Sequence, residues 1–185
     1  MANLKLEKND VSQITQEIFD NTKKQTGFIP NMYLKMGNNS ALLDIYTHGY
    51  DSFRANSGFT PTEQEVVFLS VAYQNNCEYC MAAHSFVGDK MSNVPIEVTD
   101  AIRDNKEVPD LKLAALSKLT RSLTENRGNV SQQEIDEFLA AGYAESHILG
   151  IIAGISVKTL SNYSNHLTSP VVDDIFASRT WKKRV

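Results

Sequence analysis

The segment TPTEQEVVFLSVAYQ at residues 60–74 places the strongest constraint on what this chain can fold into. Thr60 is a natural helix N-cap, Pro61 suits the first helical position, and Glu63 completes a capping box with Thr60. From Val66 to Tyr73 the predicted helix is apolar around nearly its whole circumference, which is typical of a helix enclosed by other elements. We therefore expect a domain built around this helix.

Helical patterns recur along the rest of the chain, and no segment shows the sustained apolar and polar alternation of a strand. The pattern predicts an all-α fold of about eight to ten helices. Caps and apolar spacing place further helices from residue 11 to the break at TGFIPN, from the cap Ser40 to Gly58, from 77 to about 86 before Gly88 and Asp89, over 95–105, 110–126 and 131–141, along the apolar HILGIIAGISVKTL, and from SPVVDDIF onward.

Length and composition describe a single domain. At 185 residues and 42% hydrophobic residues, the chain can bury a core without disulfides. We take residues 1–185 as one domain with residues 60–90 at its centre. The net charge is −4 and the basic residues are scattered apart from the C-terminal WKKRV, which predicts a solvated end and no nucleic-acid binding. The N-terminus lacks an apolar signal region and no run of about 18 apolar residues occurs, so we expect a cytoplasmic protein without a membrane span.

The segment NNCEYCMAAHS at residues 75–85 contains both cysteines of the chain and one of its four histidines. With an N-cap in the NN pair, Cys77 would fall in the first turn of a helix, where the helix dipole favours a thiolate. The spacing i, i+3, i+7 then puts Cys77, Cys80 and His84 on one stripe. His84 would lie close enough to take the proton of Cys80, and Cys77 would lie within reach for a disulfide. That layout is typical of a nucleophile, its base and a resolving thiol.

Other interpretations of this segment remain open. Two cysteines on an apolar helix can be small core residues. Two thiolates and an imidazole are also good zinc ligands, with His48, His147 or His166 as a fourth, although zinc-binding pairs usually lie in turns. A bridge between the two cysteines would close so small a loop that it contributes only about 2 kcal/mol, so chemistry is a better reason for it than stability. A thioredoxin is disfavoured because no βαβ unit is visible.

The residues Glu65, Cys77, Cys80 and His84 carry a resemblance to a known family. Glu65, eleven residues, Cys77-x-x-Cys80, three residues, His84 resembles the signature of the carboxymuconolactone decarboxylase superfamily in its alkylhydroperoxidase D-like branch. GFIPNMY at 27–33 and NYSNHL at 162–167 also resemble segments of its peroxidase-related members. The likeness spans most of the chain, and only the cysteine motif is highly specific.

This resemblance implies a compact helical domain with the C-x-x-C motif at the N-terminus of a central helix. It implies a homo-oligomer, often a trimer or hexamer, without a prosthetic group, that reduces hydroperoxides in antioxidant defence. By position, Cys80 would be the peroxidatic thiol, Cys77 would resolve it, and Glu65 and His84 would form the proton relay. The reductant would be an external dithiol, such as a lipoylated or thioredoxin-like protein.

Two further positions are candidates for accessory roles. Characterised alkylhydroperoxidases carry a histidine just before the second cysteine, and here that residue is Tyr79. A phenol with a pKa near 10 can donate a hydrogen bond but is a poor base at neutral pH. His166, in NYSNHL, could approach the site from the last long helix.

Three hypotheses of function follow from these residues and from the family resemblance. The first is a thiol-dependent hydroperoxide reductase that uses a C-x-x-C disulfide cycle. The second is a decarboxylase or other small-molecule enzyme like the namesake of the superfamily, although the decarboxylases proper lack the cysteine pair. The third is a non-enzymatic redox sensor or zinc-binding adaptor.

Overall fold

The computed structural model describes residue 4 and residues 11–183. These residues form nine α-helices and one 3-10 helix, without a strand, so the predicted all-α fold is confirmed. In chain order the elements are α1 (Gln13–Thr26), α2 (Asn31–Met36), α3 (Ser40–Asn56), α4 (Pro61–Gln74), α5 (Glu78–Lys90), α6 (Ile96–Asp104), α7 (Leu111–Glu125), α8 (Gln132–Ala140), α9 (Glu145–Thr168) and the 3-10 helix η1 (Asp174–Arg179).

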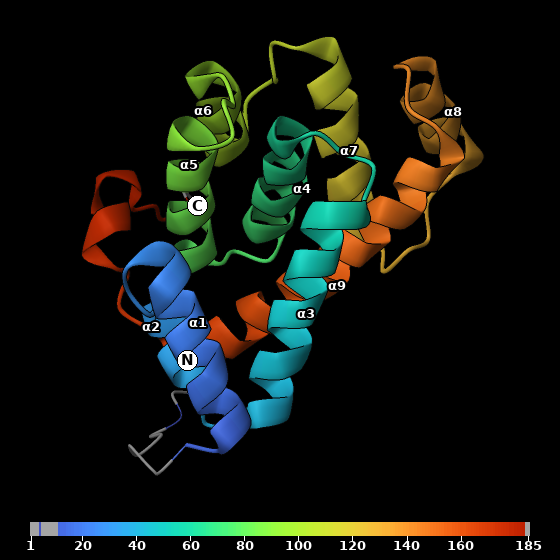
Figure 1. The fold of residues 1–185 in the computed structure, drawn as a ribbon. Coiled ribbons are helices and arrows are strands. Elements are labelled where there is room, and N and C mark those ends of the chain that lie inside the picture. The colour runs from blue at the N-terminus through green and yellow to red at the C-terminus, as the bar shows by residue number, and fades with distance from the viewer. Residues whose placement is uncertain (1–3, 5–10, 184–185) are drawn as a thin grey trace.

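Helix α4 lies at the centre of the fold, as its sequence predicts (Figure 1). The Thr60 side chain accepts a hydrogen bond from the Glu63 N–H, and the Glu63 carboxylate accepts one from the Thr60 N–H, which completes the capping box. Every residue from Glu63 to Tyr73 is buried. Helices α5, α6, α7 and α9 pack around α4, so that all of its faces are covered.

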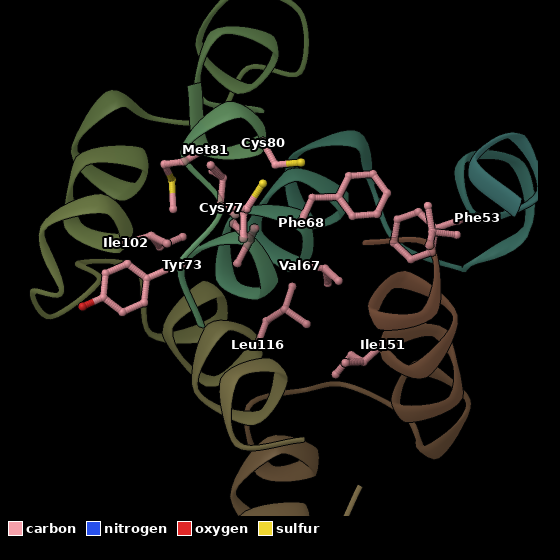
Figure 2. Packing of buried hydrophobic residues seen from close by; sticks show 14 of the residues in the cluster. Phe53, Val67, Phe68, Tyr73, Cys77, Cys80, Met81, Ile102, Leu116 and Ile151 are labelled. Carbon is pink, nitrogen blue, oxygen red and sulfur yellow. The ribbon is translucent and has the colours of Figure 1, made fainter. Parts of the chain in front are cut away.

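The hydrophobic core forms where α4 meets these neighbours. Figure 2 shows Val67 and Phe68 from α4 near Leu116 from α7 and Ile151 from α9. The leucine repeat of α7 faces inward as its spacing predicts, and its members are buried: Leu113, Leu116, Leu119 and Leu123. Both cysteines belong to the same core, because Cys77 and Cys80 pack within its cluster. The site described below is therefore embedded in packed apolar side chains.

Two predicted helix boundaries were wrong. Helix α3 is capped by Asn39 rather than Ser40, because the Asn39 side chain accepts a hydrogen bond from the Leu42 N–H. Helix α5 continues to Lys90 instead of ending near residue 86. Gly88 lies inside that helix, where the chain packs closely: an added Cβ would come within 3.2 Å of Val94 Cγ2.

Cys77 is the N-cap of α5, one position before the first turn in which its sequence places it. Its backbone N–H donates to Ala72 O at 2.9 Å, which ties it to the end of α4. Its carbonyl accepts from the Met81 N–H at 3.0 Å and begins the hydrogen bonds of α5. The C-x-x-C motif therefore lies at the N-terminus of a central helix, with its first cysteine at the cap.

The C-terminal segment returns across α5. SPVVDDIF leads into η1 as a 3-10 helix, which packs against α5. The indole of Trp181 donates to Arg103 O at 3.0 Å and lies near the ring of Tyr73, so this part of WKKRV is not the solvated end that its charge predicts. The rest of that prediction concerns residues 184–185, which lie outside the described residues. The prediction that residues 1–10 contain no signal region also concerns residues that, apart from residue 4, are not described.

No single helix in the described part of the chain is long and apolar enough to cross a membrane. Helices α8 and α9 are together long and apolar enough for a span, but the two helices are bent by 110° relative to each other.

Candidate active site

The two thiols lie side by side at the junction of α4, α5 and α9. The Cys77 and Cys80 side chains lie 3.4 Å apart, and neither cysteine forms a disulfide in this structure. Each residue is only 1% exposed. The predicted proximity of the two thiols is therefore present, in a setting shielded from bulk water.

Helix α9 supplies the polar groups that contact the sulfurs. Asn165 Nδ2 donates toward Cys80 Sγ at 3.3 Å and toward Cys77 Sγ at 3.6 Å. Cys80 Sγ also lies 3.7 Å from Ser161 Oγ. Ser161 and Asn165 are one helical turn apart, so both face α5 from the same side of α9. The amide is thus placed to stabilise negative charge on either sulfur.

Glu65, His84 and Lys158 form a buried chain of polar groups. His84 Nδ1 lies 2.8 Å from Glu65 Oε2, and Lys158 Nζ lies 2.7 Å from His84 Nε2. An ammonium group can only donate, so Nε2 accepts from Lys158 and Nδ1–H donates to Glu65. Glu65 and Lys158 are fully buried. The imidazole is thereby fixed in one orientation and one tautomer.

Aromatic rings and a second cation enclose this chain of groups. The Phe68 ring lies against the imidazole of His84, with ring centroids 4.8 Å apart, and Lys158 Nζ lies 5.3 Å from the Phe68 centroid. On the far side, the Arg54 guanidinium contacts Glu65 Oε1 and also donates to Tyr50 Oη at 2.7 Å. The buried Glu65 carboxylate therefore has two partners of favourable charge or polarity, His84 and Arg54.

The two thiols have opposite acidities. Burial by itself would raise the pKa of Cys80, but a hydrogen bond from Cys77 and the positive charge of Lys158 outweigh burial and hold this pKa well below the usual thiol value. The hydrogen bond with Cys80, together with burial, raises the pKa of Cys77 well above it. At neutral pH this arrangement favours a thiolate at Cys80 and a thiol at Cys77 that donates to it.

The pKa values of His84 and Glu65 are both lowered. Burial and the neighbouring Lys158 lower the pKa of His84, against the opposing effect of Glu65, so the imidazole is neutral. Burial would raise the pKa of Glu65, but His84 and Arg54 outweigh it and lower this pKa, so the carboxylate is ionised. The site therefore holds an anion at Glu65 and a cation at Lys158 on either side of a neutral imidazole.

The structure brings Glu65 to His84, as the sequence predicts, but it gives Nε2 of His84 a different neighbour. That nitrogen meets Lys158 rather than the thiol of Cys80. Lys158 acts on the thiol through its charge, which lowers the Cys80 pKa. The predicted transfer of the Cys80 proton to His84 stays a prediction, and in this structure His84 Nε2 accepts from Lys158. Sequence reasoning missed Lys158, Ser161, Asn165 and Arg54.

Tyr79 anchors the C-terminal segment. Its hydroxyl donates to the Asp173 carboxylate and accepts from the Met32 N–H at 3.4 Å. Burial, and then the hydrogen bond to Asp173, raise the Tyr79 pKa, so the phenol stays protonated. Its contacts join α5 to residues far away in sequence, before η1 and in α2.

His166 lies at the surface end of the site. Its Nε2 is 3.3 Å from Asn76 O, and the residue is half-buried. With Cys77 and Tyr79 it lines a hollow of about 470 Å³. Its approach from the last long helix is therefore as predicted, but its contact is with the loop before Cys77.

No group of three or more His, Cys, Asp and Glu side chains placed to hold a metal ion occurs among the described residues. Cys80 instead has an amide donor, Asn165, at 3.3 Å and is acted on by the positive charge of Lys158. Amide N–H groups and ammonium groups stabilise a free thiolate and are not metal ligands.

Comparison with protein-family models and with curated protein sequences gave no match. Solved structures do match. An uncharacterized peroxidase-related protein from Silicibacter sp. TM1040 superposes with a TM-score of 0.82 at 18% identity, covering 96% of this chain and 95% of that one. A second, from Ralstonia eutropha JMP134 and described as an alkylhydroperoxidase AhpD core, gives 0.80 at 18% identity, covering 94% and 97%. The chain has the alkylhydroperoxidase D core fold.

The same fold occurs in a protein of a different stated activity. The debrominase Bmp8, as a cysteine-to-alanine variant in complex with 2,3,4-tribromopyrrole, superposes with a TM-score of 0.73 at 15% identity, covering 94% of this chain and 92% of that one. The predicted resemblance to the alkylhydroperoxidase D-like proteins is thus confirmed in the fold, and this fold is compatible with more than one chemistry.

Proposed function

We propose that this chain is a thiol-dependent hydroperoxide reductase of the alkylhydroperoxidase D-like branch of the carboxymuconolactone decarboxylase superfamily. The observation that carries the proposal is the pairing of an acidic thiol, Cys80, with a weakly acidic thiol, Cys77, at 3.4 Å. Such a pair supplies a nucleophile that is ionised at neutral pH and a neighbour able to close a disulfide. The fold shared with peroxidase-related proteins supports the same activity.

In the proposed oxidative half-cycle, the Cys80 thiolate attacks the O–O bond of a hydroperoxide. One oxygen becomes the Cys80 sulfenic acid, and the other leaves as an alkoxide that takes a proton from the Lys158 ammonium. Cys77 then attacks the sulfenic sulfur, its proton leaves with the hydroxyl as water, and a Cys77–Cys80 disulfide results. Neutral His84, held by Glu65, positions Lys158 through the 2.7 Å contact between Nζ and Nε2.

The cycle ends when an external dithiol reduces the disulfide, and no prosthetic group takes part. The dithiol supplies two electrons and two protons, one for Cys77 and one for Lys158. A lipoylated or thioredoxin-like protein is the proposed source, and antioxidant defence is the proposed role. A homo-oligomer is also part of the proposal, supported by the exposed apolar residues Leu149, Ile152 and Tyr163 on α9. Light scattering coupled to gel filtration measures its size.

Two cysteine variants test the proposal most simply. Cys80→Ser should abolish peroxide-dependent oxidation of dihydrolipoamide, because the attacking thiolate is lost. Cys77→Ser should consume one equivalent of peroxide and stop at a Cys80 sulfenic acid, which a sulfenic-acid reagent labels and mass spectrometry locates. Turnover by Cys80→Ser at the rate of the unchanged protein contradicts the proposal.

A second candidate function is reductive removal of a halogen from a small aromatic substrate, favoured by the fold shared with the debrominase Bmp8. The same thiol pair would supply two electrons, the carbon would gain a proton, and bromide would leave with formation of the disulfide. Incubating the protein with 2,3,4-tribromopyrrole and dihydrolipoamide, and measuring released bromide beside peroxide consumption, distinguishes the two functions.

The remaining alternatives are separated by direct measurements on the purified protein. A decarboxylase or lactone-handling enzyme would act without change in the number of titratable thiols. A zinc-binding adaptor would bind zinc in proportion to protein and would release it when the thiols are oxidised. The lysine beside Cys80 disfavours this last reading, since a cation next to the thiolate opposes binding of a second cation.

A further inference from the structure

A hollow of about 470 Å³ opens at the surface beside Cys77. The loop between α4 and α5 forms one wall and the C-terminal end of α9 forms the other, with Asn76 and His166 among the residues of these walls. Glu78, exposed in the first turn of α5, lies at its side. Of the two cysteines, Cys77 alone is among the described residues that line this hollow.

Cys80 lies deeper in the fold. Its described neighbours are Ser161, Asn165 and the charge of Lys158, all from α9, together with Cys77. Because Cys77 lines the hollow and Cys80 does not, a reagent larger than a water or peroxide molecule that enters the hollow reaches Cys77 before Cys80. The two sulfurs of the disulfide differ in access even though they are bonded to each other.

The chemistry of the leaving group favours attack at the same sulfur. In thiol–disulfide exchange, the sulfur that is not attacked leaves as a thiolate, and a thiol of lower pKa leaves faster. Attack at Cys77 expels Cys80, whose thiolate is stabilised by Lys158 and Asn165. Attack at Cys80 would expel Cys77, whose pKa is raised by its hydrogen bond with Cys80 and by burial.

We propose that the external thiol reductant enters this hollow and attacks Cys77 Sγ, so that the mixed disulfide of the reductive half-cycle forms on Cys77. The reductant sulfur bonds to Cys77 Sγ, the Cys77–Cys80 bond breaks, and its electron pair leaves on Cys80. The second thiol of the reductant then attacks the reductant's own bonded sulfur. Cys77 is released and protonated, and the reductant departs as an intramolecular disulfide.

This inference rests on the disulfide cycle of the proposed function and assigns a different reaction partner to each cysteine. Peroxide reacts at Cys80, and the reductant reacts at Cys77. The hollow suits a dithiol presented on a slender chain, because it is bounded by two elements of the same subunit and has a modest volume. The acidic thiol thus never has to be exposed to the reductant.

Trapping with glutathione disulfide tests which sulfur forms the adduct. Exchange is reversible, so the cysteine that a reductant attacks is also the one that forms the mixed disulfide in the reverse direction. Cys80→Ser, which keeps Cys77, should form the glutathione adduct at least about tenfold faster than Cys77→Ser at neutral pH. A faster adduct on Cys80 in Cys77→Ser overturns the inference, and that is the outcome that thiol acidity alone would give.

A filled hollow provides a second measurement that does not depend on peroxide. The protein is oxidised to its disulfide with diamide, and its reduction by dihydrolipoamide is followed. Glu78→Trp places a large side chain in the hollow, whereas Glu97→Trp changes an equally exposed first-turn glutamate of α6 outside it. We expect about a tenfold slower reduction for Glu78→Trp only. Equal rates for the two variants overturn the inference.

Measuring oxidation by peroxide and reduction of the diamide-formed disulfide separately also distinguishes failure of this inference from failure of the proposed function. If peroxide fails to oxidise the thiols of the unchanged protein, the proposed function fails, while diamide still produces the disulfide whose reduction is measured. If peroxide turnover is normal but Glu78→Trp is reduced as fast as Glu97→Trp, the function stands and the site of reductant attack is wrong.

Discussion

The candidate site lies between two packed surfaces, which we call its two walls, and they carry different kinds of residue. The wall formed by α4 and α5 carries Glu65, Cys77, Cys80 and His84, which are the groups that react or hold a proton. The wall formed by α9 carries Lys158, Ser161 and Asn165, which contact those groups and set their charge. Reactivity in this site therefore depends on how the buried lysine of α9 packs against a helix with two thiols.

The difference shows why two cysteines three residues apart have opposite acidities. Both are buried at the start of α5, so burial and the helix dipole do not distinguish them strongly. The contacts of Cys80 with α9 and with the thiol of Cys77 do distinguish them. Changes on the α9 wall should consequently alter the chemistry of residues on the other wall.

The largest expected effect of such a change is that of Lys158→Met. Loss of the buried charge should raise the Cys80 pKa and lower the rate of peroxide reduction at neutral pH by about 100-fold. Activity should then recover as the pH rises toward about 8.5, the usual thiol pKa. A pH profile of the oxidation rate measures both effects. The control is Lys90→Met, at an exposed residue near the end of α5, which should keep the original profile.

The second effect concerns stability. Glu65→Gln leaves the Arg54 guanidinium without its anionic partner and should lower the free energy of unfolding by about 3 kcal/mol. Urea denaturation measures this change. Glu63→Gln, two residues earlier on α4, keeps a side-chain oxygen for the capping box but removes the ion pair with Lys112, and should cost only about 1 kcal/mol. Equal costs for the two variants would contradict the buried network around His84.

The pH dependence of stability should have the same origin. The folded-state pKa of Glu65 is lowered by His84 and Arg54 despite burial, so its contribution is fully present above the unfolded value of about 4.3 and is lost as the pH falls through the folded value. His84 is also lowered, so its contribution is present above about 6.5 and lost on acidification. In Glu65→Gln the dependence of the unfolding free energy on pH below about 4.3 should be weaker, because the titrating carboxyl is gone.

The smallest effect is expected at Tyr79, which hydrogen-bonds to the C-terminal segment. Tyr79→Phe removes the hydrogen bond to Asp173 and should lower stability by about 1 kcal/mol, with little change in the oxidation rate of Cys80. Thermal unfolding and stopped-flow kinetics measure the two quantities. A large fall in rate with unchanged stability would show that Tyr79 takes part in the chemistry.

The α4 and α5 wall could be predicted from the sequence because its signals are local. The capping box at Thr60 and the apolar run after it identify α4, and two cysteines with His84 at helical spacing identify the reactive stripe. The end of α5 was predicted wrongly, because Gly88 signalled a helix end, whereas it fits inside the helix at a close approach to Val94, which is a tertiary effect.

The α9 wall carried one signal that was available. Lys158 is the single charged residue within the apolar HILGIIAGISVKTL, and a lysine in a buried helix requires a partner. Which partner it meets could not be predicted, because His84 lies 74 positions away and only the packing of α9 against α4 and α5 brings them together. The same holds for Tyr79, whose partner Asp173 is 94 positions away.

The most direct test of the account is an ultraviolet titration of thiolate absorbance in the reduced protein, in Cys80→Ser and in Lys158→Met. The difference between the unchanged protein and Cys80→Ser should reveal a thiolate already formed at neutral pH, and Lys158→Met should move this transition to higher pH. A Cys80 transition at or above about 8.5 in the unchanged protein, or one that Lys158→Met does not move, would contradict this prediction.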